Sequence, residues 1–506
     1  MVGFVHAAAT LPAQSLPAAR HRSHGLAALR AEPDPVHGGR IVDASGREVL
    51  LRGVNVNAAV DYWPGTAFPT TFPFTASDAD RMAAIGWNSV RLLLSWSRVE
   101  PRPGRYDEAY LDQIAADVRL LARRRIYAVL DFHQDAWGPT LAARPGETCP
   151  PGSPPALGWD GAPGWATLEG NAPRCATAGI RELSPAVLAA FSAFWADAPG
   201  PGGVGIRTRY ERMVGHVAGR FARLSSVAGY DVMNEPNTFG ADQQAALADL
   251  YARSLRAMRR AERRAGGLRH LMFFEPSALW SSTGSGPPPN FSHDRDVVYA
   301  PHIYTGGFSG GPITAAAFQV ALDEARGFGG APVLSGEWGA DPGRANPGGD
   351  AYFLDHQRLQ DDFRFGATLW TWRESCGDPH KVGDYRTGRV PMVWGEFEVD
   401  CRTNSVLGAR GALVAELTRA YPRAAPGHLD RVAFDPVAKR FAATGSRARR
   451  GVVLEVFFPS RPSRVAISMR GLGHLRLRRA PGGATVFTAR AAGGRWSVHL
   501  VERVSR

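Results

Sequence analysis

The sequence predicts an α/β protein with an eight-stranded (β/α)8 barrel, or TIM barrel, followed by a small C-terminal all-β sandwich. Three observations predict this architecture. The chain has 506 residues, more than one ordinary hydrophobic core uses, which suits a barrel with a second domain. Short apolar runs alternate with helical patterns through most of the chain. From His428 onward, short alternating runs are separated by Gly or Pro turns, as in a β-sandwich.

The expected elements follow in chain order. Residues 1–35 are rich in Ala, Pro and Arg, and we expect them to be disordered. A β-arm over Gly39–Val49 begins the barrel domain, which is expected to span residues 36–424. The expected barrel strands are Leu50–Val56, Ser89–Leu94, Ile126–Phe132, Gly229–Met233, His270–Phe274, Val297–Ala300, Pro332–Leu334 and Gly366–Trp370. The expected helices include Glu108–Arg124, Ile206–Leu224, Ala241–Ala265, Ile313–Phe328, Ala351–Phe365 and Gly408–Ala420.

Short strands that are apolar on both faces are typical of a parallel barrel covered by helices. The sandwich domain is expected over residues 425–506. Its expected strands include Arg431–Phe434, Val452–Phe458, Arg464–Met469, His474–Arg478 and Trp496–Val501. No internal repeat is apparent, which argues against a solenoid.

The net charge of +12 is concentrated in the sandwich domain. From Arg423 to the end there are 17 Lys or Arg and 4 Asp or Glu. Such a domain could contact anionic lipid surfaces or acidic polymers, although an arginine-rich genome produces the same composition without any partner. A nucleic-acid partner is not expected, because aromatic residues are not interleaved with the basic ones. No apolar run approaches the ~20 residues that span a bilayer.

The four cysteines form two local pairs. Cys149 and Cys175 lie in the long Pro- and Gly-rich stretch Trp137–Ser184, and Cys376 and Cys401 follow the last barrel strand. Neither pair has the spacing of a zinc knuckle, so two loop disulfides and a secreted or extracytoplasmic protein are expected. The N-terminus lacks the clear apolar core of a signal peptide. The long stretch is expected to form an ordered wall over a site.

Two short strings each place a glutamate directly after an apolar run. They are Asp231-Val232-Met233-Asn234-Glu235-Pro236 and Leu334-Ser335-Gly336-Glu337-Trp338-Gly339-Ala340. Two carboxylates at the carboxyl ends of barrel strands are what retaining glycoside hydrolysis requires. Acidic residues also end strands for purely structural reasons, so the rest of the rim matters.

Polar and aromatic residues follow most of the other expected strands. They are Arg91, His133, Asp135, Asn234, Glu275, His302, Tyr304, Trp370 and Trp372. Each alone has an ordinary structural explanation, such as an ion pair or core packing. Their common position at one end of the strands indicates a functional site.

The chain resembles glycoside hydrolase family 5 of clan A, and within it the endoglycoceramidase-related branch. The resemblance covers roughly Gly39 to Pro422 and rests on the two glutamate strings and four further motifs. These are Asp131-Phe132-His133-Gln134-Asp135, Gly161-Ala162-Pro163-Gly164-Trp165-Ala166-Thr167, Phe273-Phe274-Glu275-Pro276 and Cys376-Gly377-Asp378-Pro379-His380. One departure follows the first strand, where the branch can carry a lysine near the sugar and this chain reads Asn55-Val56-Asn57-Ala58-Ala59-Val60-Asp61.

The resemblance implies the catalytic roles. Glu235 is expected to be the general acid and then the base, and repulsion from a nearby anionic Glu337 would favour its protonated form. Glu337 is expected to be the nucleophile. Arg91 and Tyr304 would hold Glu337 ionised and aimed, and His302 would support Glu235.

It also implies residues that bind the sugar. Asn234 is expected to bond the 2-hydroxyl, and His133 and Asp135 other hydroxyls. Trp370 would offer a flat apolar face to the ring, with Trp165 a second candidate on the loop. Neither a metal nor an organic cofactor is implied.

The function predicted is therefore hydrolysis of β-glycosides with retention of configuration, with glycolipids as the leading substrate class. A cellulase-like endoglucanase, an aryl or alkyl β-glucosidase and a non-catalytic carbohydrate-binding protein are the alternatives. A monomer that contacts a membrane surface is expected. A lipid aglycone further predicts an apolar channel, for which the candidates are Phe239, Trp280, Phe308, Trp338 and Val393–Trp394.

Overall fold

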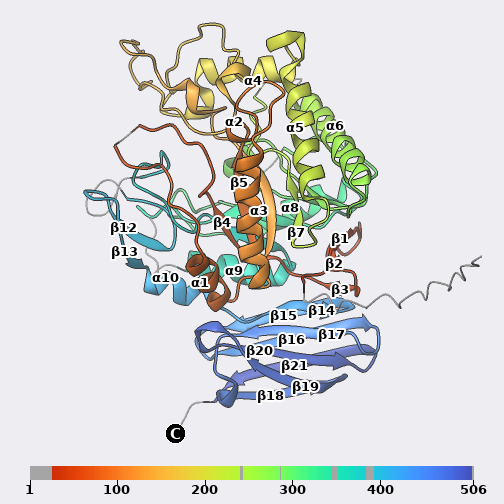
Figure 1. The fold of residues 1–506 in the computed structure, drawn as a ribbon. Coiled ribbons are helices and arrows are strands. Elements are labelled where there is room, and N and C mark those ends of the chain that lie inside the picture. Colours follow the sequence, from red (N-terminus) through yellow and green to blue (C-terminus); the bar gives the residue numbers. More distant parts are fainter. Residues whose placement is uncertain are drawn as a thin grey trace, which may run out of the picture.

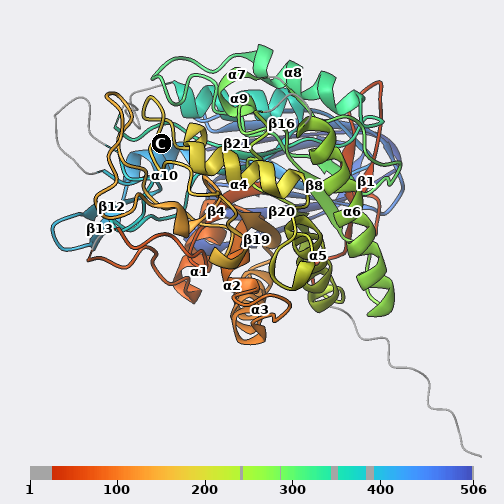
Figure 2. The same cartoon turned by 90° about the horizontal axis from the view of Figure 1, so that it is seen from above.

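The structure is a computed structural model that describes residues 25–65, 67–239, 243–284, 286–343, 351–382 and 392–503. A barrel of parallel strands with surrounding helices lies above a two-sheet β-sandwich (Figure 1). The expected fold class is confirmed. Seen from above, the helices surround the barrel strands and the sandwich lies behind them (Figure 2).

Eight parallel strands form the barrel in the order β10-β11-β4-β5-β6-β7-β8-β9. Their bounds are β4 (Arg52–Val56), β5 (Ser89–Ser95), β6 (Tyr127–His133), β7 (Val227–Asp231), β8 (Leu271–Phe274), β9 (Val297–Tyr299), β10 (Leu334–Trp338) and β11 (Gly366–Leu369). A parallel bridge between Tyr299 and Val333 connects β9 to the start of β10 and closes the ring. The expected seventh strand was placed too early, because β10 continues to Trp338 and Glu337 lies within it.

Helices cover the outside of the barrel. They are α1 (Ala76–Ile85), α2 (Trp96–Val99), α3 (Glu108–Arg123), α4 (Pro185–Trp195), α5 (Ile206–Phe221), α6 (Gln243–Arg264), α7 (Trp280–Thr283), α8 (Ala315–Arg326), α9 (Tyr352–Phe363) and α10 (Gly411–Leu417). Short 3-10 helices are η1 (Pro139–Leu141), η2 (Gly164–Ala166), η3 (Arg181–Leu183), η4 (Pro201–Gly203), η5 (Pro462–Arg464) and η6 (Pro481–Gly483).

Two differences from the expected helices have local causes. Helix α1 was not among them, although Thr75 and Asp78 form a capping box at its start and Gly86 ends it in the left-handed region. The expected helix Gly408–Ala420 is shorter than predicted. Its first residues belong to β13 (Ser405–Ala409), which pairs with β12 (Phe397–Asp400).

The sandwich contains a seven-stranded sheet of order β1-β2-β3-β14-β17-β20-β19 and a four-stranded sheet of order β15-β16-β21-β18. The first sheet comprises β1 (Leu29–Glu32), β2 (Arg40–Asp43), β3 (Arg47–Glu48), β14 (Tyr421–Pro426), β17 (Val453–Phe458), β19 (Leu472–Arg479) and β20 (Thr485–Ala491). The second comprises β15 (His428–Asp435), β16 (Arg440–Ala448), β18 (Val465–Arg470) and β21 (Gly494–Glu502).

The N-terminal arm belongs to this sheet, because β3 pairs with β14. The prediction that residues 1–35 are disordered is therefore wrong for its last part, while residues 1–24 lie outside the described residues. The physical reason is burial. Leu29 and Ala31 pack into the cluster that fills the amino-terminal end of the barrel with Tyr127, Val129 and Leu271.

The sandwich packs against the amino-terminal end of the barrel strands. The Tyr421 hydroxyl and the Arg423 guanidinium both donate to the carbonyl of Gly86, at 2.9 and 2.8 Å. Gly86 lies shortly before β5, and an added Cβ there would meet the Phe457 ring at 2.4 Å. The opposite, carboxyl-terminal end of the barrel is thus left open for a site.

Glu48 lies buried where the arm meets the sandwich. Its carboxylate accepts a hydrogen bond from the Leu429 amide at 2.9 Å and lies 3.9 Å from Arg40. Burial nevertheless dominates and raises the pKa of Glu48 from 4.5 to about 7. The folded state therefore binds this proton more tightly than the unfolded state, so stability should fall as pH rises from 4.5 to about 7.

Glu48→Gln should remove that loss. At about pH 8 the variant should gain about 2 kcal/mol of unfolding free energy over the wild type, and at about pH 5 the two should nearly coincide. Denaturant unfolding at the two pH values measures this. A variant that is less stable at pH 8 would show that the charged carboxylate stabilises the junction.

Both expected disulfides are confirmed, Cys149–Cys175 and Cys376–Cys401. No helix among the described residues is long and apolar enough to cross a bilayer.

Candidate active site

The Arg91 guanidinium is the centre of the carboxyl-terminal end of the barrel. It is fully buried on β5 and contacts six side chains at 2.8 to 3.1 Å. These are Asn55, Asp131, Asp231, Asn234, Glu275 and Glu337. Burial opposes its charge, but Asp131 and Asp231 lead the carboxylates that outweigh burial and raise the pKa of Arg91 well above its ordinary value. A permanent cation thus sits beside Glu337.

Both carboxylate oxygens of Glu337 are held. Arg91 Nη1 donates to Oε1 at 2.9 Å, and the Tyr304 hydroxyl donates to Oε2 at 2.9 Å. Burial and the Glu337 carboxylate raise the pKa of Tyr304 well above its ordinary value, so its hydroxyl stays a donor. Two donors on an anion stabilise the ionised form and fix its orientation.

Glu235 follows β7 on an unusual backbone. Its φ is +37°, in the left-handed region that costs a non-glycine residue about 1–3 kcal/mol. Its peptide N–H donates to Glu275 Oε2 at 2.9 Å, and its carbonyl accepts from the Gln134 amide at 3.0 Å. These contacts hold the backbone where the side chain can reach the centre of the barrel end.

The two glutamates lie close together. A carboxylate oxygen of Glu235 and one of Glu337 are within 4.8 Å of each other, and of a ring nitrogen of His302. Retaining glycosidases keep their carboxyl groups ≈ 5–5.5 Å apart, whereas inverting enzymes leave ≈ 6.5–9.5 Å for a water molecule. The spacing therefore matches direct attack by one carboxylate.

His302 links the two glutamates to the buried network. Its Nδ1 lies 2.9 Å from Glu235 Oε1 and 3.5 Å from Glu337 Oε2, and its Nε2 lies 3.2 Å from Glu275. Burial opposes protonation, but Glu275 and Glu337 outweigh it and raise the pKa of His302 well above its ordinary value. A protonated imidazole can donate to Glu235 and Glu275 at once.

A second polar group adjoins the first. His133 stacks on Trp370 at 5.5 Å between ring centroids and bonds Asp131 through Nδ1 at 2.7 Å. Asp135 accepts from the Arg181 guanidinium at 2.8 Å, and its other oxygen lies 3.0 Å from His380 Nε2. Burial opposes the charge of His380, but Asp378 and Asp135 raise the pKa of His380 to about 10.

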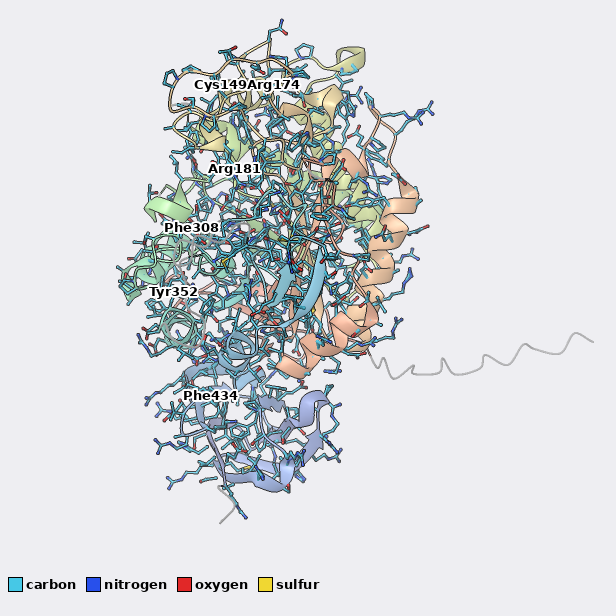
Figure 3. All side chains as sticks on the ribbon, turned by 90° about the vertical axis from the view of Figure 1, so that its left-hand side faces the viewer. Cys149, Arg174, Arg181, Phe308, Tyr352 and Phe434 are labelled. Carbon is cyan, nitrogen blue, oxygen red and sulfur yellow. A yellow bond between two sulfur atoms is a disulfide. The ribbon has the colours of Figure 1, made fainter. Side chains whose placement is uncertain are left out.

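The long loop contributes Arg181 and Trp159 to this group. The Arg181 guanidinium carbon lies 3.8 Å from the centre of the Trp159 ring, which in turn packs edge-on against His380. Figure 3 shows Arg181 below the loop tip, which Cys149 and Arg174 mark, and above Phe308. The loop thus reaches from its disulfide to the rim of the site.

Trp165 is a wrong prediction as a sugar-binding residue. Its indole N–H donates to the Glu100 carbonyl at 3.0 Å and its ring packs on Trp96, on the outer side of the barrel. The aperiodic loop sequence gave no means of telling which of its two tryptophans faces the site, and the one that does is Trp159.

Comparison with known proteins identifies the family. The family model described as Cellulase (glycosyl hydrolase family 5) matches residues 42–375, which include every strand of the barrel. The chain belongs to glycosyl hydrolase family 5.

Three relatives narrow the comparison. Endoglycoceramidase I of Rhodococcus hoagii is 27% identical over 297 residues, 53% of this chain and 52% of that protein, so the chain spans about half the length of this relative. A crystal structure of endogalactoceramidase is 36% identical with a TM-score of 0.82, covering 94% of this chain and 99% of that one. Endo-glycoceramidase II from Rhodococcus sp., complexed with a five-membered iminocyclitol, shares the fold at 24% identity, TM-score 0.69, over 92% and 99%.

Where the family 5 branch can carry a lysine, this chain has a hydrogen-bond chain. The Asn57 amide donates to Asp378 at 2.8 Å, and Asp378 bonds His380 Nδ1 at 2.9 Å. His380 then contacts Asp135. The Cys376-to-His380 motif contained a signal for this contact, but Arg181 had none, because it lies in the aperiodic loop.

The candidate apolar channel residues divide into two groups. Phe308 stacks on Tyr304 at 4.5 Å and is 44% exposed, and Trp394 packs edge-on against both rings. Trp280 and Trp338 are instead buried in the core, where Trp280 donates to Glu324 and Trp338 stacks on His356. Only the first group lies beside the glutamates.

The loop disulfide should control loop opening. Replacing Cys149 and Cys175 together by serine should lower the free energy of local opening by about 3 kcal/mol, the chain-entropy value for a loop of this length. Trypsin should then cleave within the loop roughly 100-fold faster, as limited proteolysis followed by mass spectrometry would measure. The Cys376→Ser/Cys401→Ser pair is the control. Equal cleavage of the long loop in both double variants would contradict a local role.

Proposed function

We propose that the protein hydrolyses β-glycosidic bonds of glycolipids with retention of configuration, using Glu235 and Glu337. The observation that carries this proposal is the pair of glutamates within 4.8 Å, with one carboxylate held by Arg91 and Tyr304. An anion fixed by two donors suits the nucleophile, and the glutamate that bears only the His302 contact suits the acid.

In the first step Glu337 attacks the anomeric carbon while Glu235 gives its proton to the leaving oxygen. The glycosidic C–O bond breaks, an ester forms between sugar and Glu337, and the aglycone leaves as an alcohol. Anionic Glu337 favours a protonated Glu235 before this step, and that repulsion disappears once the ester forms. Glu235 can then act as the base.

In the second step Glu235 takes a proton from water, whose oxygen attacks the anomeric carbon and releases Glu337. Two inversions give a β product. Asn234 is suited to bond the sugar 2-hydroxyl, because Arg91 and the Gln134 carbonyl fix both ends of its amide, at 2.9 and 3.0 Å.

His133, Asp135 and Trp370 are proposed to bind the sugar that is cleaved. Asp135 keeps acceptor capacity beyond its contacts with Arg181 and His380, because a carboxylate offers about four lone-pair sites. Trp370 supplies an apolar face beside these polar groups.

The glycolipid assignment rests on two supports. The endoglycoceramidase and endogalactoceramidase relatives are named for ceramide glycosides. Phe308, Trp394 and the exposed Leu279 lie on loops that follow barrel strands and offer apolar surface for a lipid chain. The two disulfides further support an extracytoplasmic location, and we propose a monomer that approaches the membrane with this end of the barrel.

A substrate panel tests the proposal. Galactosylceramide, glucosylceramide, a longer glycosphingolipid, cellotetraose and an aryl β-glucoside would each be incubated with the wild type and with Glu337→Gln. Turnover of ceramide glycosides that the variant abolishes supports the proposal. Preference for cellotetraose would make the protein cellulase-like, preference for the aryl glucoside a simple β-glucosidase, and binding without turnover a carbohydrate-binding protein.

A further inference from the structure

The end of the sandwich farthest from the barrel carries a set of exposed arginines that no carboxylate neutralises. We call Arg470, Arg476, Arg478, Arg479, Arg490 and Arg495 the basic edge. They come from β18, β19, β20 and the start of β21, and Figure 1 shows β18 and β19 at the bottom of the sandwich. Among the described residues none of the six has an ion pair with Asp or Glu.

Sheet register brings three of these arginines onto one face. Arg476 pairs with Thr488 and Arg478 with Val486, and Arg490 is two residues from Thr488 on the same strand. Side chains two apart along a strand are about 7 Å apart, and strands about 4.8 Å apart. Like charges this close repel each other, so the folded domain requires anions at this face.

β19 is also the edge of its sheet, which gives the basic edge a linear shape. Its residues from His474 to Arg479 are all exposed, and Leu475 and Leu477 remain 40% and 37% exposed. Arginine on an edge strand can serve only to prevent pairing with another chain. That role needs one or two charges, whereas six are gathered here from four strands.

We infer that the basic edge binds a linear anionic glycan whose sulfate or carboxylate groups pair with these arginines. The sandwich packs against the amino-terminal end of the barrel, and the glutamates lie at the carboxyl-terminal end. A bilayer held at the basic edge would be far from the glutamates, whereas a polymer tether leaves the site free. The edge residues include no aromatic ring on which nucleic-acid bases would stack.

The test uses the full chain and fluorescein-labelled heparin as the probe, with fluorescence anisotropy from about 50 to about 300 mM NaCl. The triple variant Arg476→Ser/Arg478→Ser/Arg490→Ser should bind at least about 10-fold more weakly than the wild type. Its dependence of log Kd on log salt should be shallower by about 2, since fewer counterions are released. Hydrolysis of a small soluble glycoside should be unchanged in the variant, and saturating heparin should not inhibit the wild type.

The matched control is Arg256→Ser/Arg260→Ser/Arg263→Ser, which removes the same charge from exposed positions of α6. It should keep nearly wild-type affinity. An equal loss in both triple variants would overturn the inference in favour of diffuse attraction by net charge. So would tighter binding, lost in the edge variant, to anionic phosphatidylglycerol vesicles or to a DNA duplex at the same salt.

Discussion

Glu337→Gln should lower kcat/KM for the best substrate by at least about 10⁴-fold, the largest effect of any single substitution we predict. An amide is a far weaker nucleophile than a carboxylate, and no ester with the sugar can form. The side chain keeps its size, and its carbonyl can still accept from Arg91 or Tyr304, so the fold should be retained. Initial rates and circular dichroism measure the two expectations.

A smaller pair of variants separates the nucleophile from the acid. In Glu337→Gly, added azide should restore turnover and give the α-glycosyl azide, because one inversion replaces two. In Glu235→Ala, azide should give the β-glycosyl azide, because Glu337 still forms the ester. The reverse stereochemistry would exchange the two roles.

Arg91→Met should have the largest effect on stability. It leaves Asp131, Asp231, Glu275 and Glu337 buried together without their cation. Breaking a buried ion pair costs about 3–5 kcal/mol of unfolding free energy. The loss should shrink at lower pH, where the remaining carboxylates take up protons. Denaturant unfolding across the pH range measures this, and kcat of the folded fraction should also fall.

Arg52→Met is the control. Arg52 is equally buried on the neighbouring strand β4, but its carboxylate partner, Asp361, also pairs with Arg419. The control should lose less stability and should leave kcat of its folded fraction unchanged. If Arg91→Met behaves like this control, Arg91 has no special part in holding Glu337.

The sequence predicted the barrel and much of the site for one physical reason. Buried parallel strands appear as short apolar runs, and barrel geometry brings whatever follows them to one end. Arg91, Glu235, His302, Tyr304 and Glu337 therefore meet in space although they are distant in the chain. Their expected mutual contacts are present in the structure.

What the sequence did not predict lies outside this regular geometry. The arm strand Arg47–Glu48 is too short to form a recognisable apolar run, and its place in the sandwich depends on pairing with β14. Arg181 reaches Asp135 through an aperiodic loop, where no period fixes which side chains face inward. The same absence of pattern explains the wrong prediction for Trp165.

The most direct test of the central claim is to trap the glycosyl-enzyme intermediate. A 2-deoxy-2-fluoro-β-glycosyl fluoride slows both steps, and its good leaving group lets the first step win. After digestion, mass spectrometry should find the fluorosugar on the peptide that contains Glu337, joined to that residue. Label on another carboxylate, or rapid hydrolysis to an α product without any label, would contradict retention through Glu337.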